Sequence, residues 1–140
     1  MVIIGFNYTK INVEKKGIPK GDIKINNNVS IKDVEEKKLP FGKSPQDGLR
    51  FVFEFVTAYE PSVGVIGLYG DVIYIDEPKK VKEIAESWKK EKKVPKEIMA
   101  EVLNSVVQKC NIQALILSQD IGLPPPLQLP RVQVNEGKKK

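Results

Sequence analysis

The stretch that decides the fold is "LRFVFEFVTAYEPSVGVIGLYGDVIYID", residues 49–76. Its first half alternates as a β-strand does, and the residues that share one face are Leu49, Phe51, Phe53, Phe55, Thr57 and Tyr59. The tight connection "EPSVG" leads into a second apolar run, so the stretch predicts an antiparallel hairpin. Val52 and Val56 make the opposite face partly apolar as well, and a sheet of this kind needs a cover on each side.

Two further strands are expected before this hairpin. Residues 3–15, "IIGFNYTKINVEK", alternate with a change of phase near Thr9, which predicts a long strand with a bulge. Turn residues follow, and residues 23–34 alternate again with a break at residues 26–28, so this second strand is expected in one or two pieces. Residues 39–48, "LPFGKSPQDG", contain two prolines and two glycines and are predicted to be a loop.

After Asp76 the apolar residues recur with the spacing of an α-helix instead of that of a β-strand. The segment "DEPKKVKEIAESWKKEKK" places Val81, Ile84, Ala85 and Trp88 on one face, which predicts a short amphipathic helix. Pro95 then opens an apolar helical pattern of about seven turns that ends at Gly122. Four antiparallel strands followed by a short and a long C-terminal helix form an α+β fold with the helices on one face. A homo-oligomer would cover the other face, and a dimer is the commonest form.

Length and composition limit the class of protein. A chain of 140 residues is one domain, expected over residues 1–134, with a basic disordered tail at residues 135–140. No secretion signal and no apolar run of about 18 residues is present, so we expect a cytoplasmic protein without membrane insertion.

The sequence offers little for catalysis. It has no histidine and a single cysteine, Cys110, which lies on the apolar stripe of the long helix and is expected to be a buried structural thiol. Glycines 64, 67 and 70 lie within a strand pattern and do not form a phosphate-binding fingerprint. We therefore expect a protein that is not an enzyme and that holds no metal or cofactor.

Basic residues concentrate in one segment, residues 79–96. Its eight lysines are interleaved with three glutamates, and its aromatic residue, Trp88, belongs to the apolar face. This pattern favours a solvated helix surface over a nucleic-acid site. Nucleic-acid binding through the basic helix from Lys79 to Lys96 is kept as an alternative.

The long helix is followed by an unusual segment, "LSQDIGLPPPLQLPRV", residues 117–132. Three consecutive prolines prevent the helix from resuming and favour an extended, polyproline-like course. Leu123, Leu127 and Leu129 give this course an apolar side, so we expect it to dock as a strap across the sheet or an adjacent subunit.

The chain resembles the SecB-like family, which comprises the protein-export chaperone SecB and its archaeal and solitary relatives. The resemblance rests on "FVFEFVTAYEPSVGVIGLYGDVIYI" as the central hairpin and on "EIMAEVLNSVVQKCNIQALILSQDIGLPPPLQLPRVQV" as the long helix with its trailing segment. It implies a dimer or a dimer of dimers whose grooves hold unfolded polypeptide. These grooves would come from the aromatic strands and the segment joining the helices. The acidic surface through which the bacterial chaperone contacts its protein-transport motor has no equivalent cluster in this chain.

We therefore expect an ATP-independent chaperone, a holdase that binds unfolded or nascent polypeptides. The expected peptide-binding residues are Phe51, Phe53, Phe55, Tyr59, Tyr69, Tyr74, Trp88, Leu123 and Leu127. The aromatic stripe of residues 51–55 is open to a second interpretation, as plain core beneath a helix. An adaptor for one specific partner, such as an aggregation-prone antitoxin, is an alternative function, whereas an enzyme with its site in a dimer cleft has no residue pattern in its favour.

Overall fold

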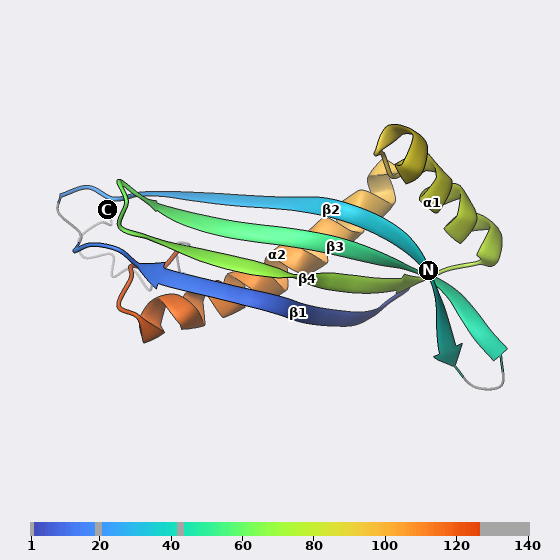
Figure 1. Cartoon of the computed structure of the whole chain (residues 1–140), viewed down its shortest axis with the longest axis horizontal. Helices are drawn as coiled ribbons and strands as arrows, with labels where there is room; N and C mark the ends of the chain where they lie inside the picture. Colours follow the sequence, from blue (N-terminus) through green and yellow to red (C-terminus); the bar gives the residue numbers. More distant parts are fainter. Residues whose placement is uncertain (1, 19–20, 42–43, 127–140) are drawn as a thin grey trace, which may run out of the picture.

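The computed structural model describes residues 2–18, 21–41 and 44–126. It forms one antiparallel sheet in the order β1-β4-β3-β2, followed by two helices (Figure 1). The elements are β1 (Val2–Lys15), β2 (Lys24–Phe41), β3 (Ser44–Glu60), β4 (Gly64–Ile75), α1 (Pro78–Glu91) and α2 (Lys96–Asp120). The predicted α+β fold, with four strands before a short and a long helix, is confirmed.

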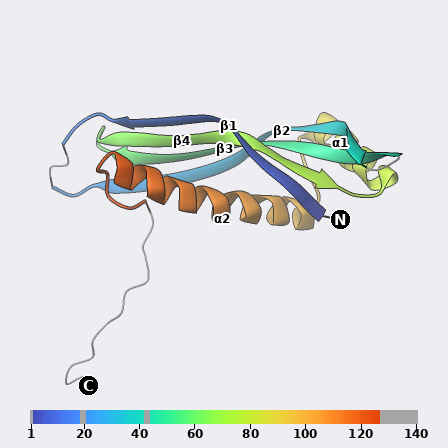
Figure 2. The same ribbon diagram turned by 90° about the horizontal axis from the view of Figure 1, so that it is seen from below.

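The sheet and α2 form two layers, and the core lies between them (Figure 2). Alternate residues of β3 and β4 point to α2, because residues paired across antiparallel strands share a face. The buried side chains of this face include Leu49, Phe51, Phe53, Phe55, Tyr59, Ile66, Leu68, Val72 and Tyr74. No described helix lies on the opposite face of the sheet, which we call the open face.

The long helix contacts the sheet through a single row of residues spaced four apart. The row consists of Ile98, Val102, Val106, Cys110, Ala114 and Ser118. Residues four apart on an α-helix differ by about 40° in direction, so such a row winds around the helix. A winding row suits a helix that crosses a twisted sheet diagonally, and α2 does so in Figure 1.

The first two strands are longer and more continuous than their sequence indicates. The bulge expected near Thr9 is confirmed by the register shift between Tyr8 and Lys10, and a second shift lies between Ile3 and Gly5. The second strand runs through residues 26–28 without a break, so it is one strand, β2. Asparagine is tolerated there because all three side chains are exposed, and Asn27 also accepts a 2.6 Å hydrogen bond from the Thr57 hydroxyl.

The prediction of a loop at residues 39–48 is wrong. The β2–β3 pairing includes residues 39–41 and 44–48, and Pro40 is even paired with Pro45. Residues 42 and 43 lie outside the described part of the chain. Strand β4 ends opposite Gly48, so beyond that point the ribbon has two strands and each has a free outer edge. A proline in such an edge position does not interrupt the hydrogen bonds of a central strand, which explains why the pattern was misleading.

Residues 123–126, the first part of the predicted strap, are docked on the sheet. The Leu123 side chain is buried, and the Tyr59 hydroxyl donates a 2.6 Å hydrogen bond to the carbonyl oxygen of Pro124. The Asn27 amide nitrogen donates to the carbonyl oxygen of Pro126 at 3.2 Å. Side-chain donors thus satisfy two carbonyl oxygens of this segment, and its prolines have no N–H group that needs a partner. The remainder of the predicted strap, with Leu127 and Leu129, and the tail lie outside the described residues.

Candidate functional site

A cavity of about 300 Å³ lies between α1 and the beginning of α2. We call it the interhelix cavity, and its lining residues are Lys80, Glu83, Ile84, Ser87, Pro95, Glu97 and Ile98. Ile84 and Ile98 are buried at its floor, with 2% and 4% of their surface exposed, whereas the charged residues are exposed at its rim. An apolar hollow with a few polar groups at its edge is the usual form of a binding pocket.

Pro95, the last residue of the segment joining the two helices, forms part of the cavity wall, and this segment is fixed by local contacts. Lys92 ends α1 in the left-handed conformation, with a φ of 57°, and its N–H donates to the Trp88 carbonyl at 2.9 Å. Its ammonium nitrogen lies 5.4 Å from the centre of the Trp88 ring. The Ser87 hydroxyl donates to the Lys93 carbonyl at 2.9 Å. Contacts within the chain therefore hold this part of the wall in place.

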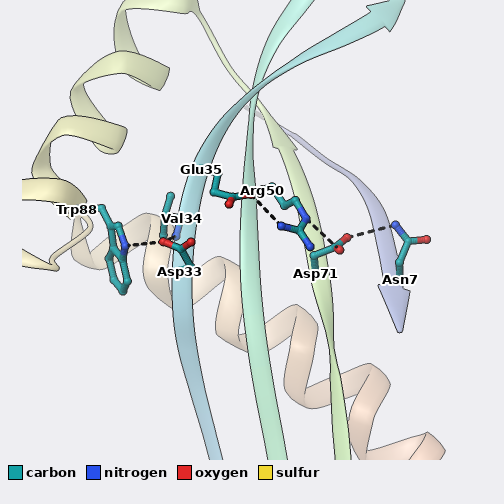
Figure 3. A network of polar contacts seen from close by, with 7 residues as sticks. All are labelled: Asn7, Asp33, Val34, Glu35, Arg50, Asp71 and Trp88. Carbon is teal, nitrogen blue, oxygen red and sulfur yellow. Dashed lines mark hydrogen bonds and ion pairs between the residues drawn. The ribbon is translucent and has the colours of Figure 1, made fainter. Parts of the chain in front are cut away.

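Trp88 also attaches α1 to the edge of the sheet. Its indole nitrogen donates to the Asp33 carboxylate at 3.2 Å, and the N–H of Val34 donates to the same oxygen at 2.9 Å (Figure 3). Asp33 follows a register shift in β2, and a bulge of this kind redirects the side chains beside it. The irregularity in β2 thus helps to set where α1 lies.

Seven of the nine expected peptide-binding residues are buried within the single chain. These are Phe51, Phe53, Phe55, Tyr59, Tyr74, Trp88 and Leu123. Phe53 stacks on Phe6 with 5.0 Å between ring centres, and Phe51 meets Tyr74 edge-on at 5.9 Å. The aromatic stripe is therefore core beneath the helix layer, as its second interpretation held, and not an exposed surface. Contact of these seven side chains with a polypeptide stays a prediction that requires the layers to separate.

The two other expected residues are placed differently. Tyr69 is partly exposed on the open face, where the Lys10 ammonium nitrogen lies 5.3 Å from its ring centre. Leu127 lies outside the described residues. The structure thus brings together the buried aromatic residues and Leu123 but leaves Tyr69 on the other side of the sheet.

The open face carries a row of polar side chains that crosses all four strands. Asp71, only 6% exposed, accepts hydrogen bonds from Arg50 Nε at 3.1 Å and from Asn7 at 3.2 Å. Arg50 Nη1 donates to Glu35 at 2.8 Å (Figure 3). Charge-assisted bonds of this kind are stronger than neutral ones. Val52 and Val56 lie on the same face of β3 as Arg50.

The titratable groups of the core are held in their neutral forms. Burial raises the pKa of Cys110 to about 11, against a smaller opposing effect of the Tyr8 hydroxyl. Burial likewise raises the pKa of Tyr59 to about 12, with an opposing contribution from Ser118. At neutral pH Cys110 is a protonated thiol and not a thiolate nucleophile. In the part of the chain that the structure describes, no group of three or more Cys, Asp or Glu side chains could hold a metal ion.

Sequence reasoning did not identify the interhelix cavity. It placed Ile84 and Ile98 on the apolar faces of two helices and Pro95 at a helix start, but it treated them as packing residues. A cavity depends on the separation and the angle of the helices, which periodicity does not record. The only signal was the resemblance, which implied that the segment joining the helices contributes to a groove.

Comparison of the sequence with protein-family models finds no match, and none of the curated proteins matches it. Among solved structures, the fold is similar to that of a SecB-like chaperone of Mycobacterium tuberculosis, solved in complex with a ChAD peptide from the HigA1 antitoxin. The match covers 95% of this chain and 91% of that chain, with a TM-score of 0.54 and 10% sequence identity. The chain thus has a SecB-like α+β fold. No helix among the described residues is long and apolar enough to cross a membrane.

Proposed function

We propose that the protein is an ATP-independent, non-enzymatic chaperone that holds extended or unfolded polypeptides as a homo-oligomer in the cytoplasm. The observation that carries this proposal is the interhelix cavity, whose floor is apolar and whose wall is fixed by Ser87 and Lys92. The likeness of the fold to a chaperone that was solved with a bound peptide supports it.

The cavity suits an apolar side chain of an extended polypeptide. Burying one large apolar side chain contributes about 1.5–3 kcal/mol, and a preformed wall keeps the entropic cost of binding low. Ile84 and Ile98 would contact the side chain directly, while Pro95 and Ser87 would lie beside it. The polar rim would remain in contact with water and with the backbone of the bound segment.

The homo-oligomer is proposed from the outward side of α2. Ile112 and Ile116 are 63% and 46% exposed, and Glu101 and Lys109 are the only charged residues between Ile98 and Gln119. A helix with so few charges on its outer side is typical of one that is buried in an assembly. A symmetric contact places the same residues opposite each other, so a nearly uncharged side avoids repulsion between copies.

Filling the cavity tests the binding site. We expect Ile98→Phe to preserve the fold, because the added ring has room in the cavity, and to weaken binding of a labelled unfolded peptide about tenfold. Ile18→Phe is the matched control, since Ile18 is 79% exposed outside the helix layer. Binding is measured by fluorescence anisotropy and chaperone activity by light scattering of a denatured client.

Two results would count against this function. Wild-type protein that is folded yet leaves client aggregation unchanged excludes a holdase, and undiminished binding by Ile98→Phe excludes the cavity as the site. Several unrelated clients are compared in the same assay, because protection of a single one indicates an adaptor.

The oligomer is tested separately by charging α2. We expect Ile112→Lys combined with Ile116→Lys to give monomers in light scattering after size-exclusion chromatography, because like charges would face each other. Asn26→Lys combined with Asn28→Lys is the control, because these exposed positions of β2 pair with Ala58 and Val56 on the face of the sheet away from α2. A wild-type monomer, or an unchanged mass in the Ile112 and Ile116 variant, rules out this contact.

A further inference from the structure

The positive charge of the described chain is concentrated around α1. Residues 79–97 hold eight lysines and four glutamates, whereas residues 1–78 hold ten basic and eleven acidic side chains. The eight lysines are all exposed. They are Lys79, Lys80, Lys82, Lys89, Lys90, Lys92, Lys93 and Lys96. We call these residues the basic surface; α1, the segment after it and the first residue of α2 carry it. Helix α1 lies at one end of the sheet (Figure 1).

The basic surface is not neutralised from within the chain. The ion pairs among the described residues all lie on the sheet and join Lys32 to Glu54, Lys38 to Asp47, and Arg50 to Glu35 and Asp71. None of them includes a lysine of the basic surface, although Glu83 and Glu86 lie on the same helix. Apart from the ammonium group of Lys92, which lies over the Trp88 ring, these lysines can therefore meet charges on a partner.

This surface adjoins the interhelix cavity. Lys80 lines the cavity, Lys93 accepts the hydrogen bond that fixes its wall, and Lys96 begins α2 directly after Pro95. A polypeptide segment whose apolar side chain entered the cavity would place its neighbouring residues among these lysines. Charge complementarity would then decide which flanking residues are favoured.

We propose that the basic surface makes the cavity selective for extended segments in which apolar residues are flanked by aspartate or glutamate. This inference rests on the proposed function, because it concerns the partner of the same site. Attraction between exposed charges is worth little for each pair, so several lysines acting together give a preference of roughly three- to tenfold at low salt.

A nucleic acid is a poorer match to the same surface. Its phosphates are closely and evenly spaced, whereas Glu83, Glu86, Glu91 and Glu97 interrupt the lysines. Base stacking needs an exposed aromatic ring, and Trp88 is only 7% exposed. The apolar floor of the cavity would also have no partner on a phosphate backbone. An acidic polypeptide can place an apolar side chain on the floor of the cavity and its carboxylates near the lysines.

The test compares three labelled peptides that share one apolar centre and carry flanks of Glu, Gln or Lys. We expect the Glu-flanked peptide to bind roughly three- to tenfold more tightly than the Gln-flanked one at low salt, and the Lys-flanked peptide to bind least. The preference should disappear at high salt. It should also disappear in the variant Lys79→Gln, Lys90→Gln, Lys96→Gln, which keeps its affinity for the Gln-flanked peptide.

The matched control variant is Lys15→Gln, Lys16→Gln, Lys24→Gln, whose exposed lysines lie at the end of β1 and the start of β2. This end of the sheet is opposite to α1 in Figure 1. It should retain the full preference. Equal affinity for all three peptides overturns the inference but leaves the proposed function intact, whereas binding of none of them overturns both. A nucleic-acid surface would be indicated by two results together. An RNA or DNA oligonucleotide would bind tightly, with an affinity that falls with salt and is lost in the first variant, and the three peptides would bind equally. That outcome overturns the inference.

Discussion

The two helices pack on the same sheet in different ways. Helix α1 buries a broad face made of Val81, Ile84, Ala85 and Trp88, and nearly all its other residues are exposed and charged. Helix α2 buries one residue per turn, yet most of its remaining surface is uncharged. The surface of α1 is thus suited to water, whereas that of α2 is suited to a further layer of protein. The interhelix cavity lies where these two kinds of surface meet.

The largest effect is expected from the residue that attaches α1. Trp88→Ala should lower the free energy of unfolding by about 3–5 kcal/mol, because a large buried ring is lost and a cavity is left. Trp88→Phe retains most of the ring but loses the hydrogen bond to Asp33, so its cost should be about 1–2 kcal/mol. Urea titrations followed by circular dichroism measure both. Equal costs would indicate that the hydrogen bond, and not packing, attaches α1.

A substitution beside the C-terminal end of α2 should lower the free energy of unfolding less than Trp88→Ala does. Tyr59→Phe removes the hydrogen bond to Pro124 and leaves that carbonyl without its partner, at a cost of about 1–2 kcal/mol. Hydrogen exchange should also become faster at Leu123, whose N–H donates to the Ser118 carbonyl at 2.8 Å. A loss of stability with unchanged exchange at Leu123 would show that the strap is held by other contacts.

Alkaline pH provides a graded test of the core. Burial raises the pKa of Tyr59 to about 12, and burial also raises the pKa of Tyr8 and of Tyr74 above their ordinary value. Below about pH 9 these phenols are protonated in both the folded and the unfolded chain, so stability should not vary through them. As the pH passes 10, the unfolded chain loses protons that the folded chain keeps, and the free energy of unfolding should fall. A urea midpoint that stays constant to about pH 11 would contradict this assignment.

The smallest effect is expected on the outward side of α2. Ile116→Gln should change the free energy of unfolding of the dilute protein by no more than about 0.5 kcal/mol, because Ile116 contributes little to the core of the single chain. Val106→Gln, on the buried row of the same helix, should cost several times more. Similar losses for the two variants would show that both sides of α2 are packed.

Much of the fold follows from local patterns in the sequence. The alternation along residues 49–60 predicts β3, and the change of period after Asp76 predicts the two helices at nearly their observed positions. The bulge beside Thr9 is visible as a change of phase. The loop predicted at residues 39–48 failed because prolines mark an edge as well as a turn, and the sequence does not say which strands lie at an edge.

The candidate site was less predictable for a similar reason. The phenylalanines of β3 were recognised as a face, but whether a helix covers that face depends on the route of the chain through space. The interhelix cavity arises from the way α1 and α2 meet, and each of its floor residues, Ile84 and Ile98, looks like ordinary core in its own helix. Sequence patterns therefore identify which residues avoid water but not where their packing leaves room.

The polar row on the open face has a consequence for folding. Asn7, Asp71, Arg50 and Glu35 come from four different strands and meet only when every strand is correctly paired. If one strand slipped by a single residue, its side chains would exchange faces, and the Asp71 carboxylate could be left buried without its arginine. Chains with long strands and many similar apolar residues have several nearly equivalent ways to pair. In this chain the carboxylate of Asp71, on a central strand, disfavours the incorrect strand pairings.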